Sequence, residues 1–310
     1  MFDIIVNPAT GSGRGKKTFE RIRPYLESAG VEYKVHFSDH ARSIEKIVHD
    51  ITSERSAEII IIGGDGSMNE AVNGIVDLKK TRLGFIPAGS GNDLAKALGI
   101  PVIKKRTDTD RLEKLVSVII EGKTRRLMDI GVCEVSGRMR LFNISSGTGF
   151  DAETSFQANR SRLKGVLNKV GSGKLIYILT ALRLIIRNRQ FACRIKTSDG
   201  RTRIYRKCFF AAVMNTRYEG GGFMFCPDAD ASDGLLDVCV AGGITPLKFI
   251  LMFPKALSGK HVKYREIDVF RSESIEMTLS SPRLIHTDGE AEGKHRRVRF
   301  YIHPQKLRTL

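Results

Sequence analysis

The stretch EIIIIGGDGSMNE, residues 58–70, decides the fold of the first part of the chain. Its four consecutive isoleucines lack polar alternation, which is typical of a central strand covered by helices on both faces. Glycines and polar residues follow at once, and Ser67 and Glu70 have the spacing of a capping box that begins a helix. A buried strand that runs through a glycine-rich turn into a helix predicts an α/β domain with a mostly parallel sheet.

Similar alternation extends over residues 1–130, which we expect to form one domain. Between the apolar runs, apolar residues recur with a 3.6-residue period, as in amphipathic crossover helices. The expected strands are residues 2–6, 33–37, 58–62 and 83–86.

The pattern changes in residues 131–310, where short alternating segments are separated by turn signals. Such a pattern predicts an all-β, sandwich-like or barrel domain. Asp199-Gly200 indicates a hairpin. Residues 174–189 read as a core helix, or alternatively as a membrane-surface helix. The expected strands are residues 140–145, 191–197, 207–213, 236–241, 274–279 and 298–303, and a second helix is expected at residues 247–257.

Composition excludes several classes of protein. The 310 residues are 41% hydrophobic and 27% charged, as in ordinary globular chains. No apolar run reaches the roughly 20 residues of a membrane-spanning helix. The N-terminus lacks the features of a signal peptide, so a cytoplasmic protein is expected. The five cysteines form no C-x-x-C pair and are expected to be reduced and buried.

The formal net charge of +17 is unevenly distributed. Residues 1–130 hold 21 basic and 18 acidic side chains, whereas residues 131–310 hold 30 and 16. A basic surplus confined to one half indicates an anionic partner, either nucleic acid or an acidic membrane surface.

Three of the expected strands end in turns rich in glycine and polar residues. These turns are residues 7–16, 63–70 and 87–94. In open α/β sheets ligands bind beyond the carboxyl ends of the strands, so the three turns are expected to line one site. Glycines let backbone N–H groups approach a phosphate, and a carboxylate such as Asp65 beside phosphates calls for Mg²⁺. In the third turn, Asn92 or Asp93 is expected to cap the following helix.

The second half holds an acidic turn, residues 228–237, with four carboxylates. Oxygen ligands on a loop can hold Mg²⁺ or Ca²⁺, although a solvated acidic turn fits the same pattern. Asp129, between the two halves, is either part of a magnesium network or a hinge residue.

These motifs resemble those of the diacylglycerol kinase catalytic-domain family, which includes bacterial soluble diacylglycerol kinases and the sphingosine and ceramide kinases. The resemblance rests on Asn7-Pro8, GGDGSMNE at 63–70, PAGSGND at 87–93, PDADASDGLLD at 227–237 and Asp288-Gly289-Glu290. Ser67 and Ser90 replace the threonines usual in the family and keep the hydroxyl.

The resemblance implies an ATP- and Mg²⁺-dependent lipid kinase, with an α/β nucleotide-binding domain at 1–130 and a β-sandwich lipid-substrate domain at 131–310. It implies that Asp65 organises Mg²⁺ and that the acceptor's proton goes to Asp288 or Glu290. It further implies a structural Mg²⁺ held by Asp230, Asp233 and the carbonyl of Leu235. The implied nucleotide-binding residues are Asn7, Ser38, Gly63, Gly64, Asp65, Gly66, Ser67, Met68, Asn69, Gly89, Ser90, Asn92 and Asp93.

Two alternatives stay open at this stage: an NAD kinase-like enzyme, which also uses a Gly-Gly-Asp-Gly turn, and a basic nucleic-acid-binding protein. The absence of tryptophan and of basic residues interleaved with aromatics disfavours nucleic acid. The preferred partners are a lipid substrate, most simply diacylglycerol, and the anionic inner face of a membrane, docked through Arg160, Arg162 and Lys164. The lipid's identity and a homodimer are left open.

Overall fold

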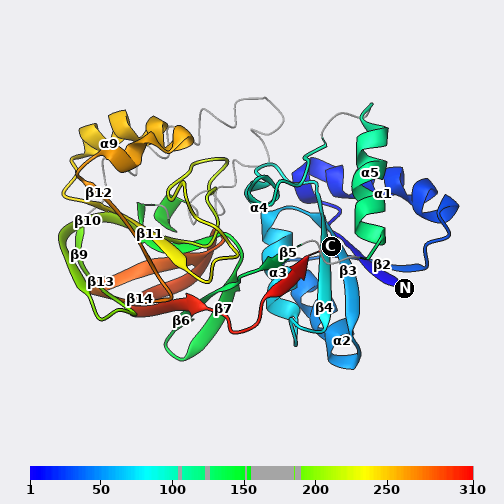
Figure 1. The fold of residues 1–310 in the computed structure, drawn as a ribbon, viewed down its shortest axis with the longest axis horizontal. Coiled ribbons are helices and arrows are strands. Elements are labelled where there is room, and N and C mark those ends of the chain that lie inside the picture. Colours follow the sequence, from blue (N-terminus) through cyan, green and yellow to red (C-terminus); the bar gives the residue numbers. More distant parts are fainter. Residues whose placement is uncertain (104–106, 123–125, 151, 155–184, 186–189, 310) are drawn as a thin grey trace.

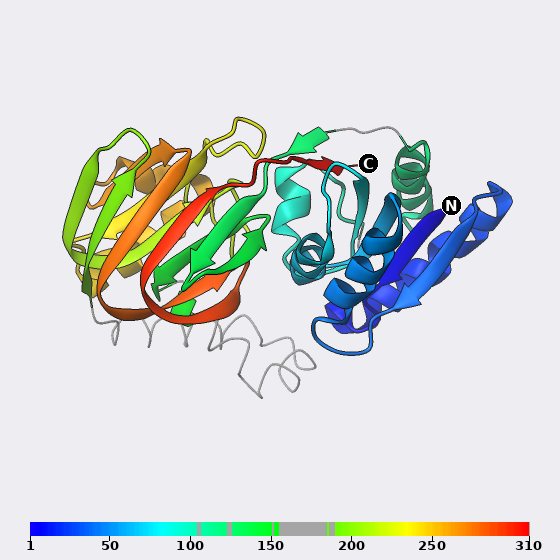
Figure 2. The same cartoon turned by 90° about the horizontal axis from the view of Figure 1, so that it is seen from below.

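The structure is a computed structural model that describes residues 1–103, 107–122, 126–150, 152–154, 185 and 190–309. It has an α/β domain and an all-β domain side by side (Figure 1). A view at right angles also shows the two domains side by side, and in it the last strand of the chain returns to the first domain (Figure 2).

The first domain is built on a six-stranded sheet of order β2-β1-β3-β4-β15-β5. Its strands are parallel except for β5, which is antiparallel to β15. All four strands expected from the sequence are present, whereas the return of β15 from the C-terminus was not anticipated. The strands are β1 (Phe2–Val6), β2 (Tyr33–Phe37), β3 (Ala57–Gly63), β4 (Thr81–Pro87), β5 (Arg126–Met128) and β15 (Leu307–Thr309).

Helices cover both faces of this sheet, as the isoleucine run of β3 requires. Ile60 and Ile62 pack among α1 and α5, while Ile59 and Ile61 pack among α2, α3 and α4. All four isoleucines are at most 1% exposed, so β3 is the buried central strand that was predicted. The helices are α1 (Thr10–Ser28), α2 (Ser43–Glu54), α3 (Asp65–Gly74), α4 (Asp93–Ala97) and α5 (Thr109–Ile120).

The second domain is a nine-stranded antiparallel sheet that curls around one hydrophobic cluster, and a second cluster lies between the sheet and α9. The long strands β10 and β13 each pair with β9 along one half and with β8 along the other, which folds the sheet over on itself. The all-β prediction is confirmed. The strands are β6 (Gly131–Val135), β7 (Arg138–Phe142), β8 (Ser145–Gly149), β9 (Phe191–Thr197), β10 (Thr202–Met214), β11 (Leu236–Gly242), β12 (Ile267–Ser272), β13 (Ser274–Thr287) and β14 (Glu290–Ile302).

Two elements of this domain differ from the prediction. Residues 140–145 are not one strand, because the backbone between β7 and β8 turns to donate its N–H groups to a carboxylate, as described below. The helix expected at 247–257 is α9 (Pro246–Met252) followed by the 3₁₀ helices η1 (Phe253–Ser258) and η2 (Lys260–Lys263). Pro254 lacks an N–H group and disfavours continuation of an α-helix.

Some predictions fall outside the described residues: residues 174–189 apart from Ile185, and the docking residues Arg160, Arg162 and Lys164. In the part of the chain that is described, no helix is long and apolar enough to cross a membrane. All five cysteines are buried, as expected, and no disulfide joins them.

Candidate active site

The three turns predicted to share a site do meet. They follow β1, β3 and β4 at the carboxyl end of the sheet, where the strand order reverses between β1 and β3, which is where α/β sheets bind ligands. A Cβ on Gly64 would lie 3.2 Å from the Cα of Gly89, and a Cβ on Gly89 would lie 2.7 Å from the Cα of Gly64. The second and third turns therefore touch backbone to backbone, which only glycine permits.

Asn7 organises the first turn. Its Oδ1 accepts hydrogen bonds from the backbone N–H groups of Ala9 and Thr10, both at 3.2 Å. Its Nδ2 donates to Oγ of Ser67 at 3.1 Å. One side chain thus shapes the turn after β1 and ties it to the turn after β3.

Arg14 links the first turn to the third. Its Nη2 donates to the backbone carbonyl of Gly89 at 2.7 Å. Residues 11–13 have left-handed backbone angles, so regular helix begins only after them, at about Arg14. The Arg14 contact therefore holds the first turn next to the third.

The capping box predicted for Ser67 and Glu70 is wrong. The side chain of Ser67 binds Asn7, and no side chain caps α3. Glu70 Oε2 instead accepts from the N–H of Ile44 at 3.2 Å and so caps α2. The amide of Ile44 lies in the first turn of α2, where it has no partner within the helix. The local sequence does not show that Glu70 lies next to it.

Asp65 caps the helix that follows the third turn. Its half-buried carboxylate accepts from the N–H groups of Asp93 (3.1 Å) and Leu94 (3.2 Å). Burial raises the pKa of Asp65 to about 6, and the nearby carboxylates of Asp93 and Asp288 add to this shift while the two hydrogen bonds oppose it. Asp65 is thus a carboxylate whose charge would be stabilised by a cation.

Asn92 occupies the N-cap position of α4, as expected, but neither its side chain nor that of Asp93 caps the helix. Asn92 is the N-cap residue, in a left-handed conformation with φ 56°, but its Nδ2 donates to the carbonyl of Gly89 at 2.8 Å. Asp93 binds Lys96 Nζ at 2.8 Å and accepts from the N–H of Gly221, in the second domain, at 2.6 Å. The third turn therefore also contacts the domain that follows.

The turn between β13 and β14 is fixed by Asp288. Its backbone is left-handed, with φ 46°, and its carboxylate faces the first domain. Five N–H groups donate to this carboxylate: Asn69 Nδ2 (2.9 Å), Asn143 N (2.8 Å), Asn143 Nδ2 (3.3 Å), Ile144 N (2.8 Å) and Ser145 N (3.0 Å). These contacts use the lone pairs of both oxygens.

Glu290 lies two residues after Asp288, and its carboxylate has different surroundings. Its side chain is exposed at the start of β14, and it makes no hydrogen bond or ion pair with the residues that the structure describes. Of the two acidic residues in this motif, Glu290 alone has a carboxylate that is open to a substrate.

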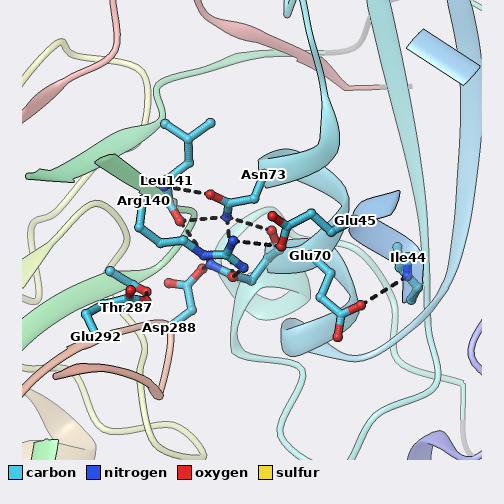
Figure 3. A network of polar contacts seen from close by, with 10 residues as sticks. Ile44, Glu45, Glu70, Asn73, Arg140, Leu141, Thr287, Asp288 and Glu292 are labelled. Carbon is cyan, nitrogen blue, oxygen red and sulfur yellow. Dashed lines mark hydrogen bonds and ion pairs between the residues drawn. The ribbon is translucent and has the colours of Figure 1, made fainter. Parts of the chain in front are cut away.

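An amide and guanidinium network joins the two domains beside this turn (Figure 3). Asn73, on α3, donates to the carbonyl of Leu141 at 3.0 Å and accepts from the N–H of the same residue at 2.9 Å, as a neighbouring strand would. Arg140 binds Glu45 Oε2 at 2.7 Å and Asn69 Oδ1 at 3.1 Å. The network fixes α3 against β7.

Asn73, Arg140 and Glu45 were not singled out in the sequence. Two asparagines at i and i+4 on one helix, Asn69 and Asn73, were the available signal, because asparagine is a poor residue for a helix interior unless its side chain has a specific partner. The other two residues carry no such signal.

The remaining predicted nucleotide-binding residues are distributed around the turns. Ser38 follows β2 and donates its backbone N–H to the carbonyl of Val6 at 2.9 Å. Ser90 is exposed on the third turn, and Gly66 is exposed on the second. Met68 is buried in the core, so its side chain faces away from the turns.

The donor set suits Mg²⁺. A Cβ placed on Gly91 would lie 3.4 Å from Asp65 Oδ2 and 3.7 Å from Asp93 Oδ2, so the two carboxylates flank one small residue. No cluster of three or more metal-binding side chains occurs among the described residues. One or two carboxylates with substrate phosphates are the usual protein environment of Mg²⁺.

In the acidic turn, residues 228–237, the carboxylates of Asp230 and Asp233 make their hydrogen bonds within the turn itself. Asp230 accepts from the N–H and hydroxyl of Ser232, at 3.1 and 2.7 Å, and Asp233 Oδ1 accepts from the N–H of Leu235 at 2.9 Å. Fully buried Asp129 binds the N–H of Gly234 at 2.8 Å, so it joins this turn to the first domain.

Comparison with known families agrees with this architecture. Residues 2–133 match the sequence model of the diacylglycerol kinase catalytic domain, and residues 144–310 match that of the YegS C-terminal NAD kinase beta sandwich-like domain. These matches, together with the relatives below, define a lipid kinase, a phosphotransferase with an alcohol acceptor.

Individual relatives narrow this class. A diacylglycerol kinase of Bacillus subtilis is 30% identical over 94% of this chain and 89% of its own length. One from Mycobacterium tuberculosis is 27% identical over 92% of this chain and 87% of its length. A diacylglycerol kinase structure from Bacillus anthracis, 19% identical, superposes with a TM-score of 0.69 over 99% of this chain and 95% of that one, and so shares the fold. The chain belongs to the diacylglycerol kinase family.

Proposed function

We propose that the protein transfers the γ-phosphate of ATP to the free hydroxyl of diacylglycerol, forming phosphatidic acid, with Mg²⁺ as cofactor. The observation that supports this most is the 2.9 Å hydrogen bond from Asn69 to Asp288. It seats the turn between β13 and β14, which carries Asp288 and Glu290, against α3, the helix that begins at Asp65. A carboxylate for the acceptor and a phosphate-binding turn are thereby held at one junction.

In this proposal the strand-end turns bind ATP. The glycine turns present backbone N–H groups, and the side chains of Asn7 and Asn92 hold the turns in shape. Mg²⁺, when bound, neutralises phosphate charge during the transfer. Asp65 and Asp93 would hold it. The proposed contacts are Asn7, Ser38, Gly63, Gly64, Asp65, Gly66, Ser67, the backbone of Met68, Asn69, Gly89, Ser90, Asn92 and Asp93.

Glu290 is the proposed proton acceptor, and Asp288 is a positioning residue. The acceptor oxygen forms a bond to the γ-phosphorus as the bond to the β–γ bridging oxygen breaks, ADP leaves, and the hydroxyl proton passes to Glu290. Asp288 already accepts five hydrogen bonds, which supports its role in holding the turn.

A second Mg²⁺ is proposed at the acidic turn, held by Asp230, Asp233 and the carbonyl of Leu235. Each of the two carboxylates uses one oxygen in the local turn. The other oxygen of Asp233 is 3.8 Å from Arg271, a loose contact that a cation would replace. Its role would be to fix the turn that carries Asp129's partner, Gly234.

The acceptor lipid resides in a bilayer, so we propose that the enzyme works on the inner face of the membrane. The net charge of residues 131–310, with 30 basic and 16 acidic side chains, favours an anionic surface.

The test is transfer of radiolabelled γ-phosphate to a panel of acceptors in mixed micelles: diacylglycerol, a sphingoid base, a polyprenol, phosphatidylglycerol and, as a soluble acceptor, NAD. NAD is included because the second domain's match is NAD kinase-like. Labelling of diacylglycerol above the others supports the proposal. Labelling of NAD alone, or of a different lipid, would overturn the choice of acceptor.

A further inference from the structure

The strongest unexplained surface of the second domain is the outer side of α9, η1 and η2, residues 246–263, here called the docking face. Leu247 and Leu251 stand at i and i+4, on one side of α9, and are 69% and 68% exposed. Leu257 and Val262 are exposed in the two 3₁₀ helices. Four large apolar side chains in so short a segment are unusual on a protein surface that meets only water.

The inner side of the same segment is firmly anchored. Phe249 and Met252 are buried with Phe209 and Phe210 in an aromatic core, and the rings of Phe209 and Phe249 lie 4.4 Å apart. The exposed leucines therefore do not arise from a loose helix. They belong to a segment whose other side already packs on the sheet. Figure 1 shows α9 along the upper side of the second domain.

The charges around these leucines are mostly basic, although Glu266 pairs with Lys248 at 2.7 Å and with Arg265 at 3.1 Å. Residues 238–265 contain no aspartate or glutamate but four lysines and an arginine. Three of the lysines, Lys255, Lys260 and Lys263, line a hollow of about 650 Å³ together with Pro254, Ser258 and Tyr264. Lys260 and Lys263 make no ion pair or hydrogen bond with the described residues.

We infer that the docking face binds the surface of an anionic bilayer, with Leu247 and Leu251 inserted among the lipids and the lysines against acidic headgroups. Exposed leucines flanked by lysines are what an interfacial helix needs. A second copy of the chain fits less well, because a symmetric dimer would oppose the lysines of one copy to those of the other. The inference deepens the lipid-kinase proposal and rests on it only for its biological purpose.

The absence of tryptophan from the chain makes insertion directly measurable. Leu251→Trp creates a single fluorescent probe on the docking face, and Ile204→Trp, at a position that is also 68% exposed, serves as the matched control. With vesicles of phosphatidylcholine and phosphatidylglycerol, the Leu251→Trp emission is expected to shift to the blue and to be quenched by brominated acyl chains. Ile204→Trp should show neither change. Equal responses, or none at Leu251→Trp, would overturn the inference.

Binding measured by co-sedimentation with the same vesicles gives a second readout. Leu247→Asn with Leu251→Asn should weaken binding at least about tenfold. Lys260→Gln with Lys263→Gln should do so by about tenfold, whereas Lys79→Gln with Lys80→Gln, exposed lysines of the first domain, should have little effect. Unchanged binding in the docking-face variants contradicts the inference. So does a change from dimer to monomer in the leucine variant without loss of vesicle binding.

Kinase turnover of a short-chain diacylglycerol in detergent separates the two proposals. The docking-face variants should keep wild-type turnover there while losing activity on vesicles. If the wild type inserts into vesicles but phosphorylates no lipid, the proposed function is wrong, whereas the inference about the docking face is supported. If turnover is normal and all variants bind vesicles equally well, the inference about the docking face is wrong and the proposed function is unaffected.

Discussion

The carboxylate of Asp65 accepts a hydrogen bond from the backbone N–H of Asp93, 3.1 Å away, and so joins the turn after β3 to the turn after β4. Asp65→Asn keeps the size and one acceptor oxygen but removes the charge that would hold a cation. We expect kcat to fall at least about a hundredfold with the fold retained. Steady-state kinetics over a range of Mg²⁺ concentrations, with circular dichroism, check this. Asp50→Asn, on the exposed face of α2, is the control. Near-normal kcat would exclude Asp65 from the reaction.

The raised pKa of Asp65 predicts a pH dependence of stability. The folded protein protonates Asp65 at about 6 and the unfolded chain at 3.8, so the folded state holds an extra proton between these values. The contribution of this group to stability is fully present below about pH 4 and is lost as pH rises through 6. Relative to Asp65→Asn, the wild type should lose up to about 3 kcal/mol of unfolding free energy between pH 4 and pH 7. Urea unfolding in a chelator at several pH values measures this. A difference independent of pH would contradict the assigned cause.

Asp288 and Glu290 should give opposite results when each is made neutral. Glu290→Gln should lower kcat at least about a hundredfold and leave the unfolding free energy unchanged, because the side chain is exposed and unpaired among the described residues. Asp288→Asn should lower the unfolding free energy by about 3 kcal/mol, because an amide cannot accept from five N–H groups. Glu276→Gln, exposed on β13, is the control. If Asp288→Asn keeps full stability, the carboxylate has a different role.

Asn73 is not itself a proposed substrate contact, but its Nδ2 donates to the backbone carbonyl of Asn69 at 2.8 Å, and its loss should affect both stability and turnover. Asn73→Ala removes the two hydrogen bonds to Leu141 and should lower the unfolding free energy by about 2 kcal/mol. These bonds fix β7 against α3, and the residues that follow β7 hold the carboxylate of Asp288. We therefore expect kcat to fall more than the affinity for ATP. Chemical unfolding and separate determination of kcat and KM test this. A variant that is less stable but has unchanged kcat would show that the network supports the fold alone.

Much of this arrangement could be predicted from local patterns. The isoleucine run of β3 and the glycine turns predicted a sheet covered on both faces with one site at its edge. A strand buried on both faces requires consecutive apolar residues, and close approach of two backbones requires glycine, so both features can be recognised in the sequence. The hairpin at Asp199-Gly200 was likewise local, and β9 and β10 pair across it.

What could not be predicted depends on partners far apart in the chain. Glu70 caps α2 instead of its own helix, and Asp65 caps α4, because each met an unpaired amide that only the folded chain brings near. The break between β7 and β8 has the same origin, since Asp288 lies more than 140 residues away. The proposal of Glu290 over Asp288 as the proton acceptor likewise rests on the contacts around each carboxylate, which the sequence does not show.

The most direct test of the central claim is the stoichiometry of product formation from a short-chain diacylglycerol and MgATP. Phosphatidic acid, identified by mass spectrometry, and ADP should appear in equal amounts, and both should be lost in Glu290→Gln. ADP release without phosphatidic acid, or phosphatidic acid formed at the wild-type rate by Glu290→Gln, would contradict the account.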